Sequence, residues 1–200
     1  MTLSLPSDFQ PALAHERLSQ VASWLLEEWS ATQDDLVRET DSSYSRGTTT
    51  FDRQKNRIIN ECRKGQYNWL GIVNGANDLV FSIGGINCRF SNDSAKTPKK
   101  RAVLEAHRFQ MSLLESTAPG HAARFCFVID RGPTESSDRH VELLGYSSAN
   151  ELVCRWSSAT MVRTLVDIND IRPEPIEIAK PIIAPKRINT GDAADAAAGP

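Results

Sequence analysis

Four basic residues gather within six positions near the middle of the chain. They are Lys96, Lys99, Lys100 and Arg101. Thr97 and Pro98 are typical of a helix start, so we expect a helix over residues 98–116 with Thr97 as its N-cap. Cations in the first turn of a helix oppose its dipole by roughly a few tenths of a kcal/mol each. A bound anion, with phosphate as the first candidate, would relieve that conflict.

These cations belong to a wider basic segment. Residues 44–110 hold 12 Lys and Arg against 5 Asp and Glu, whereas residues 1–43 hold 2 against 8. Further cations that the fold could add to the same patch are Arg46, Arg53, Arg57 and Arg89. Arg53, Arg57 and Lys64 should share one exposed helix face, because the later two follow Arg53 by four and eleven positions. Two interpretations stay open: the segment meets an anionic partner, or an acidic N-terminal helix packs beside it and neutralises it.

A second candidate constellation is acidic. Asp130 ends one expected strand, and His140 and Glu142 lie in the next. Carboxylates on adjacent strands hold the divalent ion in many metal-dependent nucleases. The D…ExK pattern of such nucleases is incomplete, because Leu143 and Leu144 follow Glu142. A polar hairpin loop accounts for the same residues without catalysis.

Familiar cofactor and metal motifs are missing from the sequence. The stretches GIVNG and SIGGIN match neither glycine-rich phosphate motif, and each precedes an expected strand rather than a helix. The histidines and cysteines are scattered, without the short paired spacings of zinc sites. We therefore expect no cofactor and no metal. The cysteines are expected to be reduced and buried, and His107 to be a core residue of the third helix.

Hydrophobic periodicity indicates the elements that would position these residues. An apolar stripe at helical spacing over residues 18–29 predicts a first helix, entered near Pro11. Residues 40–50 are expected to be a loop, and a second helix is expected over residues 51–64, ended by Gly65. Short apolar runs predict six strands: 69–73, 79–83, 86–90, 124–130, 139–146 and 151–156.

These elements predict an α+β domain, with an antiparallel sheet of about five to six strands and three helices packed mainly on one face. The domain is expected to span residues 1–168, followed by a Pro-rich, extended and low-complexity tail over residues 169–200. No apolar run approaches the roughly 20 residues that cross a bilayer. The N-terminus lacks the features of a secretory signal, so we expect a cytoplasmic protein.

The charge pattern favours a non-catalytic binding or regulatory protein. Its partner would be an anionic macromolecule, nucleic acid first and an acidic protein surface second. Tyr44, Tyr67 and Trp69 lie in the same segment and could stack on bases. The alternative is a metal-dependent phosphodiesterase or nuclease that uses the carboxylates around Asp130 and Glu142. A third possibility is docking through the Pro-rich tail, and nothing in the sequence indicates an oligomeric state.

Overall fold

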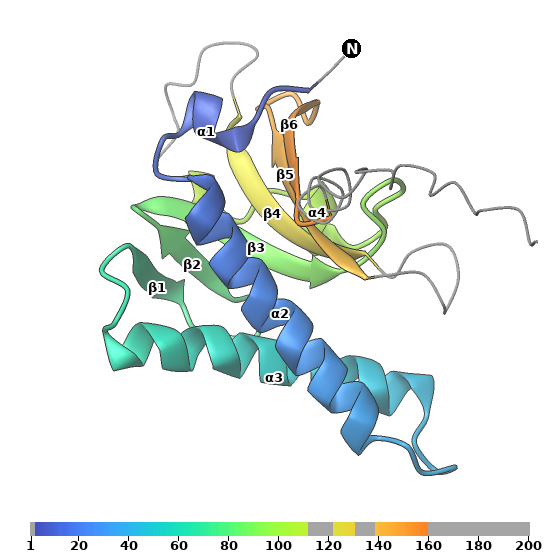
Figure 1. Cartoon of the computed structure of the whole chain (residues 1–200). Coiled ribbons are helices and arrows are strands. Elements are labelled where there is room, and N and C mark those ends of the chain that lie inside the picture. Colours follow the sequence, from blue (N-terminus) through green and yellow to red (C-terminus); the bar gives the residue numbers. More distant parts are fainter. Residues whose placement is uncertain (1–2, 112–121, 131–138, 160–200) are drawn as a thin grey trace, which may run out of the picture.

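A six-stranded sheet forms the centre of this computed structural model, which describes residues 3–111, 122–130 and 139–159 (Figure 1). The strands lie side by side in sequence order: β1 (Leu70–Asn74), β2 (Val80–Ile83), β3 (Ile86–Asn92), β4 (Arg124–Asp130), β5 (His140–Tyr146) and β6 (Leu152–Ser157). All six predicted strands are confirmed to within two residues at each end. The predicted domain end near residue 168 and the predicted tail lie outside the described residues.

The sheet is mixed, so the prediction of a purely antiparallel sheet is wrong at one pair. β3 and β4 run parallel, with Cys88 opposite Phe125 and Asn92 opposite Ile129, whereas the other neighbours are antiparallel. Parallel strands need a crossover of a dozen residues or more. Residues 93–123 supply that length, while the short turns that indicated antiparallel pairing connect only the other strands. The broader expectation of an α+β fold is confirmed.

Two long helices cover one face of the sheet (Figure 1). α2 (His15–Asp35) lies across the sheet and buries the predicted apolar stripe, which includes Leu18, Val21, Ala22 and Leu25. α3 (Ser43–Lys64) crosses α2 and stacks Phe51 on Phe90 of β3, with ring centroids 5.0 Å apart. Alternate side chains of β4 point into the same core: Phe125, Phe127 and Ile129.

α2 begins later than predicted. A short helix, α1 (Pro6–Phe9), precedes it, and Asp8 accepts a hydrogen bond from the Leu5 N–H at 2.9 Å. The chain then turns, so that α2 begins at His15 rather than near Pro11. Among the described helices, none is both long and apolar enough to cross a membrane.

α3 begins eight residues earlier than predicted, because local hydrogen bonds stabilise its polar first turns. The Ser42 Oγ accepts the Ser45 N–H at 3.1 Å, which is a helix N-cap, so residues 43–50 are helical rather than a loop. At the other end, Gly65 adopts the left-handed conformation with φ 66° and ends the helix, as predicted.

The opposite face of the sheet is covered by the crossover between β3 and β4. Its helix α4 (Arg101–Leu104) buries Val103 in a second apolar cluster, with Cys126, Val128, Leu144 and Tyr146. The prediction that the helices gather mainly on one face is therefore confirmed for α2 and α3 and wrong for α4.

The predicted helix over residues 98–116 is interrupted. α4 ends at Leu104 and α5 (Arg108–Met111) is separate, with residues 112–116 outside the described residues. At the end of α4, the carbonyl oxygens of Val103 and Leu104 accept hydrogen bonds from the Arg124 guanidinium of β4. His107 lies between the two helices and is partly exposed, so its prediction as a core residue is wrong. Desolvation, with a smaller contribution from the Arg89 charge, lowers the pKa of His107.

A buried amide joins α2, α3 and β3. The Gln54 side chain is fully buried, and its Nε2 donates to the Leu25 carbonyl oxygen at 2.8 Å. Its Oε1 accepts a hydrogen bond from the Asn92 Nδ2, also at 2.8 Å. A buried polar group that loses its partner costs about 1–3 kcal/mol. This bridge therefore specifies how α3 is rotated between α2 and the sheet.

The Gln54→Ala substitution is expected to lower the free energy of unfolding by about 3 kcal/mol, because it leaves the Asn92 amide and a cavity buried. Urea unfolding followed by circular dichroism measures this change. Gln66→Ala is the matched control, since Gln66 is exposed, and it should stay within about 0.5 kcal/mol of the wild type. Equal effects of the two substitutions would show that the bridge is not important for stability.

The four cysteines are free thiols, as predicted, and burial makes them poor acids. Desolvation raises the pKa of Cys62 to about 11 and that of Cys126 and Cys154 to about 12. Cys88 is fully buried, and its pKa lies still further above the usual range. The reactive thiolate is therefore scarce at neutral pH.

Iodoacetamide at pH 8 should label the folded protein slowly, with the partly exposed Cys62 reacting first and its rate rising toward pH 11. Stability should fall as pH rises above roughly 8.5, because the thiols of the unfolded chain ionise before those of the folded chain. Mass spectrometry of labelled peptides with and without urea checks the first expectation. Rapid labelling of Cys88 in the folded protein would contradict it.

Candidate nucleic-acid interface

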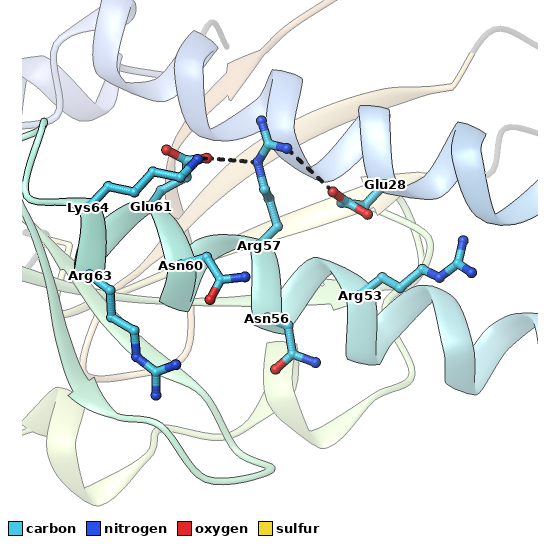
Figure 2. A pocket seen from close by; sticks show the side chains of 8 residues that line it. All are labelled: Glu28, Arg53, Asn56, Arg57, Asn60, Glu61, Arg63 and Lys64. Carbon is cyan, nitrogen blue, oxygen red and sulfur yellow. Dashed lines mark hydrogen bonds and ion pairs between the residues drawn. The ribbon is translucent and has the colours of Figure 1, made fainter.

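A surface hollow of about 560 Å³ lies along the solvent side of α3 (Figure 2). Its basic and amide lining residues all come from that helix: Arg53, Asn56, Arg57, Asn60, Arg63 and Lys64. They recur at spacings of three and four, which places them on one helix face. The prediction that Arg53, Arg57 and Lys64 share a face is confirmed, because all three line this hollow.

The arginines nearest α2 are paired with its carboxylates. Arg53 contacts Asp35 at 2.6 Å, and Arg57 contacts Glu27 at 3.3 Å and Glu28 at 3.6 Å. The acidic N-terminal helix therefore packs beside part of the basic segment, as one of the two interpretations held. Asp35 and Glu27 keep 59% and 56% of their side chains exposed, so each ion pair is worth about 0–1 kcal/mol.

A second row of side chains on α3 points away from α2 (Figure 2). Asn56, Asn60 and Arg63 are exposed, and Asn56 donates a hydrogen bond to Asp52 at 3.0 Å. The side chains of Asn60 and Arg63 have no hydrogen bond or ion pair with any other described residue. Arg53, whose guanidinium pairs with Asp35 of α2, lies at the other end of the hollow, and together with it these residues form what we call the α3 row: Arg53, Asn56, Asn60 and Arg63. The periodicity of α3 was the sequence signal for this row, yet only Arg53 was a predicted site residue.

The other predicted basic residues do not join the α3 row. Arg46 lines a separate cleft near the start of α3, and Arg89 is buried on the far face of the sheet, 3.4 Å from Asp78. The remaining four lie in the β3–β4 crossover on that same far face: Lys96, Lys99, Lys100 and Arg101. The sheet therefore divides the predicted patch into groups that cannot contact one surface together.

At the crossover, where a bound anion was expected, the carboxylate of Asp93 takes that place. One oxygen of the Asp93 carboxylate accepts the backbone N–H groups of Lys99 and Lys100 at 2.8 and 2.7 Å. Arg101 pairs with Glu105 at 2.8 Å, and this contact, mainly through its hydrogen bond, lowers the pKa of the Glu105 carboxyl. Lys100, not Thr97, is the N-cap of α4. The electrostatic conflict predicted at this helix start is thus relieved without a ligand.

The aromatic residues predicted as stacking surfaces have different environments. Tyr67 and Trp69 pack around Trp24 of α2, with ring centroids 5.2 and 6.4 Å from its own, and so belong to the core. Tyr44 is 80% exposed at the start of α3. Of the three, Tyr44 alone retains a free ring face for a base.

The predicted acidic constellation is assembled around a buried carboxylate. Asp130 lies opposite His140 in the β4–β5 ladder, and His140 Nε2 is 3.0 Å from Glu142 Oε1. The same oxygen accepts a hydrogen bond from Arg155 of β6 at 2.5 Å, a partner that sequence reasoning missed. Asp130 accepts the Ala95 N–H at 2.8 Å, which ties it to the crossover.

This constellation resembles a structural ion pair more than a metal site. Glu142 is 1% exposed, and its Oε2 has no hydrogen-bond partner among the residues that the structure describes. Within residues 3–111, 122–130 and 139–159, no group of three or more His, Cys, Asp or Glu is placed to hold a metal ion. The alternative of a metal-dependent phosphodiesterase remains a prediction that depends on Asp130 and Glu142.

Arg155→Met is expected to lower the free energy of unfolding by about 3 kcal/mol, because it leaves the buried Glu142 carboxylate without its cation. The double variant Glu142→Leu with Arg155→Met should recover most of that loss, since neither charge is then buried alone. Thermal or urea unfolding of the two variants and wild type measures the coupling. Additive losses in the double variant would contradict a structural ion pair.

Comparison with known proteins gives this chain no relative. No protein-family model, no curated protein and no solved structure matches it. Its function must therefore be inferred from the geometry of its own residues.

Proposed function

We propose that the chain is a non-catalytic, nucleic-acid-binding protein that presents the α3 row to a duplex. The observation that carries this proposal is the row itself, in which two arginines and two asparagines project from one face of an exposed helix. Arg and Asn are the side chains that pair bidentately with guanine and adenine edges. Both also donate hydrogen bonds to phosphate oxygens.

The dimensions of the row suit a major groove, which admits an α-helix. Ten residues separate Arg53 from Arg63, which is about 15 Å at 1.5 Å per residue. A B-form duplex rises about 3.4 Å per base pair, so the row would span roughly four base pairs. Lys64 and Arg57 lie beside the row in the same hollow and would approach the phosphate backbone.

The α2 carboxylates limit this affinity without preventing it. Arg53 leaves an exposed ion pair worth about 0–1 kcal/mol, whereas a hydrogen bond to a charged group contributes about 1.5–3 kcal/mol, so a phosphate would compete successfully for Arg53. Arg57 is held more firmly, because it also pairs with the nearly buried Glu61 at 3.0 Å. With about three phosphate contacts, the logarithm of the binding constant should fall with the logarithm of salt concentration with a slope near −3.

Arg63→Glu should weaken duplex binding at least tenfold, because it reverses the charge of an arginine that no described residue neutralises. Fluorescence anisotropy with a labelled random duplex at low salt measures the affinity. Arg101→Glu is the control: it makes the same charge change at an exposed site on the far side of the sheet, and it should alter affinity less than twofold. Equal losses in both variants, or no binding by the wild type, would refute the proposal.

Asp35→Asn should strengthen duplex binding, because it releases Arg53 from its ion pair, and Glu27→Gln should do so less, because Arg57 keeps its pairs with Glu28 and Glu61. The same anisotropy titrations detect the gain, and circular dichroism confirms that the fold is retained. Glu16→Gln is the matched control, since Glu16 lies on the first turn of α2, away from these pairs. A gain of similar size in the control would mean that net charge alone sets the affinity.

A further inference from the structure

A second, smaller cleft lies where four elements meet. It has a volume of about 160 Å³ and receives Trp29 from α2, Arg46 and Thr50 from α3, Asn92 from the end of β3, and Arg139 just before β5. These residues are far apart in the sequence, so only the folded chain brings them together. None of the described lining residues is acidic.

The two arginines give the cleft its charge. The Arg139 guanidinium carbon lies 3.5 Å from the centroid of the Trp29 ring, a cation–π contact that fixes its position. Arg46 Nη1 is 3.5 Å from the Leu36 carbonyl oxygen, which is a long and weak hydrogen bond. A guanidinium has five N–H donors, so Arg46 keeps most of its own for another acceptor.

The position of the cleft in the fold also favours a ligand. Asn92 is the last residue of β3, and β3 is parallel to β4. In open α/β sheets, ligands bind beyond the carboxyl ends of parallel strands, and the single parallel pair of this mixed sheet ends beside the cleft. Ser43, the first residue of the 22-residue α3, lines the cleft as well, and the N-terminal end of a helix dipole adds positive potential there.

Gly47 of α3 is one of the residues that line this cleft. A glycine within a helix costs about 0.5–1 kcal/mol relative to alanine. Gly47 has an ordinary helical conformation, and a Cβ added to it would meet no atom within 4 Å. Packing therefore does not require glycine here. Because Gly47 lines the cleft, we expect a long side chain at this position to reduce the volume of the cleft.

The volume restricts the size of the occupant. The cleft has a volume of about 160 Å³. Pockets for whole organic ligands are larger, at about 300–1,000 Å³. The cleft thus fits a small anionic group. Arginine is a common partner of phosphate, because its planar guanidinium can donate two parallel hydrogen bonds to it.

We propose that this cleft binds a phosphoryl group through Arg46 and Arg139. It is a different site from the α3 row, since it lies at the start of α3 and includes β-strand residues. The ligand is either free phosphate or the phosphate end of a larger molecule that extends into solvent. Binding would order Arg46 across the cleft and fix α2, α3 and the sheet relative to one another.

Isothermal titration of the full chain with inorganic phosphate, at constant ionic strength, tests the proposal. Arg46→Gln, Arg139→Gln and Gly47→Leu should each weaken phosphate binding at least tenfold, the last by filling the cleft without removing a charge. Arg38→Gln is the control, because Arg38 is exposed on the loop between α2 and α3 and does not line the cleft. Circular dichroism shows that each variant is folded.

The outcomes separate the alternatives. Tighter binding of phosphoserine than of phosphate, lost in the same three variants, supports a ligand whose phosphate is attached to a larger molecule. Similar binding of the two supports free phosphate. Acetate binding as tight as phosphate, unchanged affinity in Gly47→Leu, or no phosphate binding up to about 20 millimolar overturns the proposal. Loss of duplex binding in Arg63→Glu has no bearing on this result, so the two sites can fail independently.

Discussion

The buried Gln54 amide sets the rotation of α3, and both candidate surfaces depend on that rotation. The helix turns Thr50, Gln54, Ile58 and Glu61 inward, a stripe that is mostly polar. Ile58 and the partly buried Phe51, Ile59 and Cys62 contribute apolar burial, whereas the polar side chains gain little from leaving water. The hydrogen bonds of Gln54 to α2 and β3 add a directional constraint on the same face. With that stripe inward, Asn56, Asn60 and Arg63 face solvent, while Arg53 and Arg57 lie along the side next to α2.

Charge compensation between the two long helices changes what kind of recognition the α3 face can perform. α2 carries five carboxylates and one arginine, whereas α3 carries six cations and two carboxylates. Their fields largely cancel beyond a Debye length of about 10 Å. What remains close to the surface is a set of directed N–H donors. Such a face distinguishes ligands by geometry at short range and attracts them only weakly from a distance.

Much of the fold was predictable from the sequence because its strands are short apolar runs with clear turns. Two of the features that were not predicted show why. The polar residues 43–50 form a helix through a cap and internal hydrogen bonds, which hydrophobic periodicity does not detect. The parallel pairing of β3 with β4 depends on the path of residues 93–123, which local sequence does not specify. The candidate sites likewise divide into one that local sequence indicates and one that depends on tertiary structure. The α3 face follows from helical spacing, whereas Arg139 and Arg46 come to line one cleft only through tertiary structure.

The parallel contact between β3 and β4 also divides the sheet into two meanders with different folding requirements. Within β1–β3 and within β4–β6, neighbouring strands are consecutive and joined by short connections. Partners across the β3–β4 contact, such as Cys88 and Phe125, are 37 positions apart in the sequence. Closing a chain loop of that length costs roughly 3 kcal/mol of entropy before any contact compensates for it. The order of assembly follows from topology: each meander can form early, and their junction, which lies beside both Asn92 and the small cleft, is completed late.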